Sequence, residues 1–389
     1  MTSLLKYRYT ILLFLALLAN TIYYSFKGVV VVTDSITYLQ YAQNLTRGIL
    51  IPDRVIWYTG YCIFLAVFLK IGLGIKSIVF IQVILSSFSV LALQKATENF
   101  SKNSLLAFLS GFCYLLFLEV FQWNMYVLTE SIFASCICFF LLFLSMYWMH
   151  KSNKDLIFSI FIALFIFWIR PLGIALLVAI GVFLFLEKMY TIMPKPVLYV
   201  FLGVFLALVL YLANTMLHDY ALVENYITGE VIFNFSKIPN YLGHQYALVT
   251  LPNNLTFLKE GSTVSKALYF YVQNPIFSIK LALLKGFFFL SHTKPYYSTM
   301  HNICILVMLL PAYIGLVSFI KKNKSTIMSF VLVYLGCTTC IVMLTCEDWD
   351  GRFFMGILPF LCCFGYPYIS FLRSFTAPYS IVKNKNITL

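Results

Sequence analysis

Charged residues are scarce in this sequence, and their scarcity excludes a water-soluble domain. Only 11% of its 389 residues are Asp, Glu, Lys or Arg, whereas 61% are hydrophobic and the mean hydropathy is +0.90. A water-facing surface needs roughly a quarter of its residues to be charged. No small-residue cleavage site follows the first apolar run, which therefore predicts a retained helix and not a signal peptide. We expect an all-α protein that crosses a membrane many times.

Several familiar signatures are also missing. The sequence has no Walker motif, no glycine-rich loop after a strand, no fixed-period repeat and no inverted halves with matching broken helices. Nucleotide chemistry on the cytoplasmic side therefore has no recognisable motif. Most of the ten cysteines fall inside apolar runs, where cysteine acts as a small hydrophobic residue. Cys337 and Cys340 have the spacing of half a zinc site but no second half follows, so no metal site is predicted.

The apolar runs predict about ten membrane-spanning helices. A span must cross about 30 Å of hydrocarbon, which takes about 20 apolar residues. Such runs lie at 8–26, 76–95, 104–120, 129–149, 156–169, 172–187, 196–214, 303–320, 325–345 and 353–372. Two more runs, 58–74 and 275–290, would move lysine-bearing loops to the other side if they crossed. They are expected to be interfacial or re-entrant helices in the first and fourth outer loops.

The net charge of +13 is spread unevenly over this map. The predicted cytoplasmic face holds both termini, most of the excess Lys and Arg, and only three acidic residues: Glu98, Asp155 and Glu187. Because Lys and Arg favour cytoplasmic loops, the basic excess indicates orientation and not a nucleic-acid partner. The remaining acidic residues lie at or beyond the outer edge of the membrane. The working face is therefore expected to be the outer one.

The same map divides the chain into three segments. Residues 1–214 are expected to form an N-terminal transmembrane module with a first outer loop at 27–75. Residues 215–302 are expected to form a long outer loop with interfacial helices, and residues 303–389 to supply the C-terminal transmembrane helices. Recognition of an acceptor substrate is expected in the long outer loop.

The first outer loop begins with the polar stretch TDSITYLQYAQNLTRG, residues 33–48. Asp34 and Tyr38 are four residues apart, so a short helix would stack the tyrosine beneath the carboxylate. One interpretation is that Thr33, Asp34 or Ser35 caps this helix, a common role for such residues. The other is that Asp34 has a chemical role. The two interpretations are compatible.

Together with the following PDRVIWYTGYCIFLAVFLKIGLG, this stretch resembles the first outer loop of the GT-C superfamily of polytopic glycosyltransferases. That group includes protein O-mannosyltransferases and bacterial aminoarabinose transferases. Three later stretches resemble further elements of the family, in the same order: VLTESIFASCICFFLLFL with Glu130, FWIRPLGIALL with Arg170, and GRFFMGILPFL with Arg352. The map argued from charge places all four on one side. Some family members carry a second acid directly after the first, where this chain has Ser35.

The resemblance implies transfer of a sugar, with inversion, from a polyprenyl-phosphate carrier to a hydroxyl or amine of a cell-envelope acceptor. The reaction is expected on the outer face of the bacterial inner (plasma) membrane. Asp34 is the candidate general base. A guanidinium suits the leaving phosphate because it presents two parallel donors. The candidate substrate-binding residues are Tyr38, Arg54, Glu130, Arg170 and Arg352. We expect no tightly bound cofactor, with a divalent cation at Glu130 as the one alternative.

Each of these residues has a structural interpretation as well. Arg170 could be an arginine that reaches water from a helix end, and Arg54 a solvated loop charge. Glu130 could serve only to favour the N-terminus of its helix. Asp348 and Asp350 could simply pair with Arg352.

Two other classes of function also stay open. A lipid-linked polysaccharide polymerase would use similar donors, but that class usually relies on arginines in its outer loops, and residues 215–302 contain none. A non-catalytic flippase or transporter for lipid-linked sugars would place ionisable residues at mid-membrane depth. The concentration of charge at one face favours the transferase.

Overall fold

The structure is a computed structural model that describes residues 5–189, 194–219, 226–233, 235, 247–258, 260–369 and 372. Within those residues the chain is built from helices, and its only β-type pairings are three isolated bridges. The chain divides into two compact units. Unit 1 comprises Met1–Gly173, Met308–Lys324 and Met355–Leu389, and unit 2 comprises Ile174–Val307 and Ser325–Phe354. The three-segment division expected from the sequence concerns membrane topology and stays a prediction.

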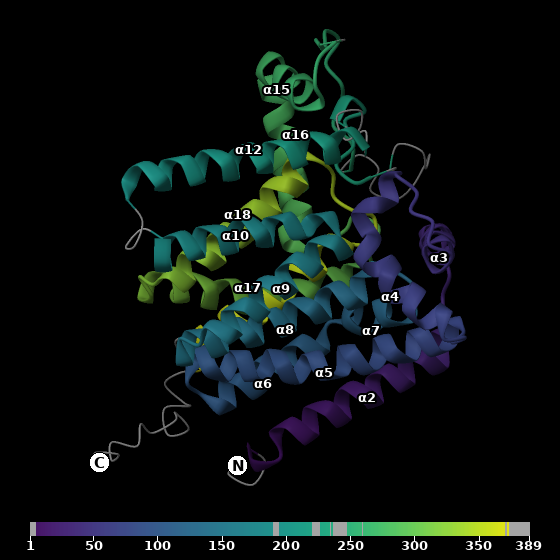
Figure 1. The fold of residues 1–389 in the computed structure, drawn as a ribbon, viewed down its shortest axis with the longest axis vertical. Coiled ribbons are helices and arrows are strands. Elements are labelled where there is room, and N and C mark those ends of the chain that lie inside the picture. Colours follow the sequence, from purple (N-terminus) through teal and green to yellow (C-terminus); the bar gives the residue numbers. More distant parts are fainter. Residues whose placement is uncertain are drawn as a thin grey trace. The chain divides into compact units, whose positions relative to one another are not determined.

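Unit 1 is a helical bundle with α5 (Ile75–Ser101) at its centre. This helix packs against α2 (Arg8–Lys27), α6 (Ser104–Leu116) and α8 (Thr129–His150), which Figure 1 draws side by side. The first outer loop adds a second group, in which α3 (Thr33–Thr46) packs on α4 (Thr59–Lys70). The remaining elements are η1 (Arg54–Tyr58), α7 (Leu118–Met125), α9 (Asn153–Ile169), η2 (Pro171–Gly173), the later part of α17 (Thr299–Lys322), α19 (Leu358–Phe364) and η6 (Tyr366–Tyr368).

Unit 2 is organised around α18 (Thr326–Leu344), which packs against α10 (Ile174–Leu184) and α16 (Pro275–Ser291). In the same unit, α12 (Lys195–Asp219) packs against α15 (Thr263–Gln273). The unit also contains the π-helical turn η3 (Phe185–Met189), the start of α17 and most of η5 (Arg352–Gly356). A buried apolar cluster that includes Tyr226, Ile232, Phe270 and Leu281 joins the extended segments of this unit to α15 and α16.

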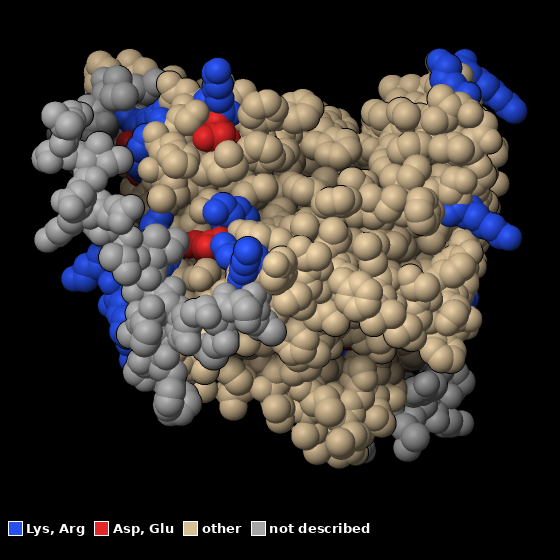
Figure 2. Space-filling model, turned by 90° about the horizontal axis from the view of Figure 1, so that it is seen from below, with Lys and Arg blue, Asp and Glu red and all other residues tan. Residues whose placement is uncertain are grey.

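The described residues contain seven helices long and apolar enough to cross a membrane, or nine if each of two bent pairs forms one span. The seven are Arg8–Lys27, Ile75–Ser101, Thr129–His150, Pro171–Lys188, Pro196–Met216, Thr299–Lys322 and Thr326–Leu344. Each coincides with a span predicted from the sequence. Figure 2 shows one face of the protein, on which uncharged side chains dominate. The chain is therefore an all-helical membrane protein with several spans.

Two predicted spans differ from the structure. The run at 104–120 becomes α6 and α7, which are bent by 55° at Phe117, a residue with extended backbone. The run at 156–169, by contrast, does form one continuous helix, α9, of 17 residues. The run at 353–372 is broken into η5, α19 and η6, because Gly365 and Pro367 interrupt it. At about 1.5 Å per residue, the seven residues of α19 cover only a third of a bilayer.

A group of charges fixes one end of unit 1. The carboxylate of Glu98 accepts hydrogen bonds from Arg8 Nη2 (2.9 Å) and from the Tyr9 hydroxyl (2.7 Å), and Lys95 Nζ lies 3.5 Å away. Only 6% of the Glu98 side chain is exposed. These bonds tie the start of α2 to the last turns of α5. Arg8, Lys95 and Glu98 thus lie at one end of the unit, as the charge map requires.

Candidate functional site

Backbone pairing brings the first two acidic motifs together. A parallel bridge joins Val30 to Tyr126, with backbone hydrogen bonds of 2.9 and 3.2 Å. Asp34 follows Val30 by four residues, and Glu130 follows Tyr126 by four. Both acids lie in the first turn of a helix, α3 or α8, where the exposed N–H groups favour a carboxylate. The bridge therefore sets two helix N-termini, each with one acid, beside each other.

Glu130 and Arg170 form a buried ion pair. Arg170 Nη1 donates to Glu130 Oε1 at 2.6 Å, and only 6% and 2% of the two side chains are exposed. The Thr129 hydroxyl donates to the other carboxylate oxygen at 3.3 Å, and the guanidinium lies 5.9 Å from the centre of the Phe133 ring. Arg170 does follow the end of α9, as the sequence indicated. It does not extend into water, however, so the interpretation as a solvent-reaching arginine is wrong.

Three tyrosines form a wall beside this pair. The ring of Tyr38, on α3, lies 5.2 Å from that of Tyr58 at the end of η1. It also meets the ring of Tyr61, on α4, edge to face at 5.6 Å. Such offset and edge contacts are favourable for aromatic pairs. Tyr38 and Tyr61 are buried and Tyr58 is half-buried, so the wall reaches the surface at Tyr58.

The electrostatic surroundings of Tyr38 show which charges share this site. Burial raises the pKa of the Tyr38 hydroxyl well above its usual value near 10, and the nearby Tyr58, Glu130 and Asp34 raise it further. Arg170 acts in the opposite direction. The phenol therefore stays neutral near pH 7 and can donate a hydrogen bond. Asp34, Glu130 and Arg170 thus all act on Tyr38, which brings four of the six residues predicted from the sequence into one group.

Of the three residues that could cap α3, Ser35 makes the hydrogen bond at the start of the helix. The Ser35 hydroxyl accepts a hydrogen bond from the backbone N–H of Val32, the residue that precedes α3, at 3.0 Å. Ser35 is fully buried, whereas Asp34 is half-buried. Asp34 is therefore partly accessible at the N-terminus of α3, while Ser35 stabilises the start of the helix.

Arg54 and Arg352 are the two predicted residues outside this group. Arg54 is exposed at the start of η1, where Asp53 accepts the backbone N–H of Val55 at 2.8 Å. Arg352 belongs to unit 2, where its Nε and Nη2 donate to the two carboxylate oxygens of Asp348 at 2.9 and 3.1 Å. The expected pairing of Asp348 with Arg352 is confirmed. It leaves 24% of the arginine side chain exposed.

A buried glutamine, Gln82, connects parts of the site by hydrogen bonds, and the sequence did not predict it. Gln82, on α5, accepts from the Tyr61 hydroxyl at 3.0 Å. Its amide nitrogen donates to the backbone carbonyls of Asn124 (3.2 Å) and Tyr126 (2.9 Å). One side chain thus links the tyrosine wall to the segment that carries Glu130. The available signal was a glutamine inside an apolar run, which in lipid requires partners.

A second buried ion pair, in unit 2, was also missed. Lys294 Nζ and Glu347 Oε1 are 2.5 Å apart, and neither side chain is exposed. Burial raises the pKa of the Glu347 carboxyl, although the adjacent Lys294 opposes that rise. The two residues are 53 positions apart in a sequence whose spacing gives no sign of the contact.

Gly60 sets the distance between α4 and the end of α9. A Cβ atom added there would lie 2.8–2.9 Å from backbone atoms of Trp168 and Ile169, directly before Arg170. Gly60→Ala should therefore push the tyrosine wall away from Arg170 and cost about 1–3 kcal/mol of stability. We expect a lower thermal unfolding midpoint in detergent. Gly74→Ala is the matched control, because nothing lies within 4 Å of its added Cβ and its φ is −78°. Equal midpoints for the two variants would contradict this packing.

Among the described residues, no group of three or more His, Cys, Asp or Glu could hold a metal ion. The chain matches no protein-family model and no curated protein. The likeness to glycosyltransferases therefore depends on the four quoted motifs alone, and function has to be argued from the site.

Proposed function

We propose that the chain is an integral membrane glycosyltransferase that moves a sugar from a polyprenyl-phosphate donor to a hydroxyl or amine of a cell-envelope acceptor. The observation that supports it most is the gathering of Asp34, Tyr38, Glu130 and Arg170 at the bridged N-termini of α3 and α8. Sequence motifs almost a hundred residues apart thereby contribute to one site. We place this site on the outer face of the inner membrane, with both termini cytoplasmic.

The proposed reaction needs a base, a stabilised leaving phosphate and little else. The Asp34 carboxylate accepts the proton of the acceptor hydroxyl while the acceptor oxygen forms a bond to the anomeric carbon. The bond from that carbon to the lipid phosphate breaks, and the phosphate leaves with the electron pair. Attack opposite the leaving group inverts the anomeric centre. The half-buried position of Asp34 leaves it accessible to the acceptor.

The other residues have supporting roles in this proposal. Glu130, 2.6 Å away, balances the charge of Arg170. We therefore assign this pair to positioning the site and not to binding the leaving phosphate. Tyr38, kept neutral by burial, is a hydrogen-bond donor toward the acceptor or the sugar. Arg352 is the proposed partner of the leaving phosphate, because a guanidinium suits phosphate oxygens and 24% of this side chain stays exposed beside Asp348.

The test is an assay for cleavage of the donor. Membranes that contain the protein are incubated with polyprenyl-phosphate-linked sugars and envelope extract, and free polyprenyl phosphate is measured against membranes that lack it. We expect release of the lipid phosphate together with transfer of the sugar. Movement of intact donor across the membrane without cleavage would instead identify a flippase. Chains of repeating units in the product would identify a polymerase.

Arg352→Lys is expected to weaken use of the donor while the fold is retained. Lysine keeps the charge but loses the paired donors, and one charge-assisted hydrogen bond is worth about 1.5 kcal/mol, or roughly tenfold in KM. The measurement is the KM for the lipid-linked sugar. Arg54→Lys, in an exposed position, is the control and should leave the KM unchanged. An unaltered KM for Arg352→Lys would remove the phosphate role.

A further inference from the structure

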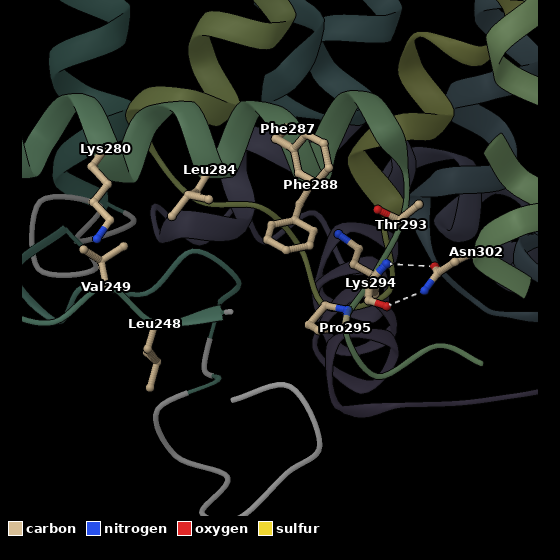
Figure 3. Close-up of a pocket in the computed structure, with 10 residues that line it drawn as sticks. All are labelled: Leu248, Val249, Lys280, Leu284, Phe287, Phe288, Thr293, Lys294, Pro295 and Asn302. Carbon is tan, nitrogen blue, oxygen red and sulfur yellow. Dashed lines mark hydrogen bonds between the residues drawn. The ribbon is translucent and has the colours of Figure 1, made fainter. Parts of the chain in front are cut away.

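Unit 2 contains a cavity of about 400 Å³ beside α16. Its lining comprises Lys280, Leu284, Phe287 and Phe288 from that helix, Leu248 and Val249 from the facing segment, and Thr293, Lys294, Pro295 and Asn302 at one end. Figure 3 shows Lys280, Leu284 and Phe288 projecting from α16 toward the facing segment. The volume lies within the range of small-molecule sites, about 300–1,000 Å³.

The walls of the cavity are held in place by hydrogen bonds to the backbone. The N–H of Val249 donates to the carbonyl of Gly229 at 2.8 Å, within the bridge that joins Glu230 to Leu248. At the other end, the Asn302 side chain accepts from the Lys294 N–H and donates to its carbonyl, at 3.1 and 2.9 Å (Figure 3). Both walls of the cavity are therefore built features of the fold.

The two lysines that line the cavity differ in how accessible they are to a ligand. Lys294 is fully buried, and its ammonium is 2.5 Å from Glu347. Lys280 is exposed, and none of the lining residues is acidic. A ligand of this cavity therefore meets an apolar wall and one accessible ammonium group. That combination favours an amphiphile with an anionic head.

The cavity adjoins an apolar stripe on α16. Ile276, Ile279, Leu283 and Phe287 are 84%, 59%, 60% and 60% exposed, and their spacing puts them on one side of the helix. In a membrane protein such a stripe faces lipid chains. Phe287 belongs both to the stripe and to the cavity lining. The cavity is thus continuous with a lipid-facing surface, and a lysine beside such a surface reaches toward head groups.

We propose that this cavity binds an anionic phospholipid of the surrounding bilayer, with the lipid phosphate at Lys280 and one acyl chain along Leu284 and Phe287. Basic pockets beside membrane helices commonly select acidic head groups. The cavity lining shares no residue with those assigned to the transfer reaction, Arg352 included. Its occupant is a resident lipid and not the sugar donor.

The test compares lipids on the full-length protein in detergent by native mass spectrometry. We expect phosphatidylglycerol to bind more tightly than phosphatidylcholine, and Lys280→Gln to lose roughly tenfold in affinity for phosphatidylglycerol only. Lys76→Gln, an exposed lysine at the start of α5, should bind like wild type. Leu284→Trp, which fills the cavity and keeps the charge, should also lose phosphatidylglycerol.

Three results would overturn the proposal. In the first, Lys280→Gln and Leu284→Trp both retain wild-type affinity for phosphatidylglycerol. In the second, inorganic phosphate at millimolar concentration displaces the lipid completely, which would indicate a free-anion site. In the third, polyprenyl phosphate displaces phosphatidylglycerol at equal concentration, which would assign the cavity to the donor. None of these results depends on whether sugar transfer is observed, so the two proposals can fail separately.

Discussion

Asp34→Asn is expected to lower the rate of sugar transfer by about two to four orders of magnitude, the usual contribution of a general base. Asn has the shape of Asp but cannot accept the acceptor proton. In the first turn of α3 it loses only the attraction of a charge to the helix N-terminus, about 0.3–1 kcal/mol. A residue that only favoured the start of α3 would therefore tolerate this change, whereas a base would not. The measurement is transfer per unit of membrane-inserted protein, since the variant should fold normally.

The same loop provides a control for Asp34→Asn. Asp53 is exposed and accepts the N–H of Val55 at the start of η1, a bond that asparagine can also accept. Asp53→Asn should therefore leave both stability and transfer at wild-type values. If the transfer rate of Asp34→Asn were within twofold of that of Asp53→Asn, the assignment of the base would be refuted. The carboxylate at position 34 would then matter no more than one at an exposed loop position.

Removal of one partner from the Glu130–Arg170 pair is expected to destabilise the protein by about 3–5 kcal/mol. Either Glu130→Gln or Arg170→Met leaves the other charged side chain, which is almost fully buried, without this ion pair. The alternative, that Glu130 merely favours the N-terminus of α8, predicts a loss of only about 0.3–1 kcal/mol. The size of the loss therefore separates the two roles. The measurement is unfolding in detergent, followed by denaturant or by temperature.

The double variant completes this test. Glu130→Gln combined with Arg170→Met removes both charges, so it should recover much of the stability lost by each single variant. We expect the stable double variant to transfer sugar slowly, because the wall at Tyr38 loses the charges beside it. If the losses of the two single variants simply added, the pair would have no coupling and the positioning role would be rejected.

The sequence predicted the helices better than their interruptions. The limits of α2 and α8 follow from long apolar runs with polar ends, and the structure reproduces them within one residue, whereas α5 continues to Ser101, past the predicted end at residue 95. The bend at Phe117 has no such signal, because no Pro or Gly occurs there. The broken region after Arg352 did carry a signal in Gly365 and Pro367, but its high hydropathy favoured a single span.

The candidate site was predicted as residue types but not as contacts. Asp34, Glu130 and Arg170 were recognisable from their motifs, yet their meeting depends on a backbone bridge at Val30 that no periodicity encodes. The buried pair of Lys294 with Glu347 lacked even a motif. Partners far apart in the chain are chosen by tertiary packing, for which local pattern gives no rule.

The Val30–Tyr126 bridge has a consequence for how this chain can vary. Each acid lies four residues after a residue of this bridge. The number of residues in that interval therefore sets where the carboxylate lies. Because the backbone directly before each helix is extended, deleting or adding one residue there would shift the helix start by about 3.3 Å relative to the bridge. We therefore expect related proteins to keep the lengths of these two intervals.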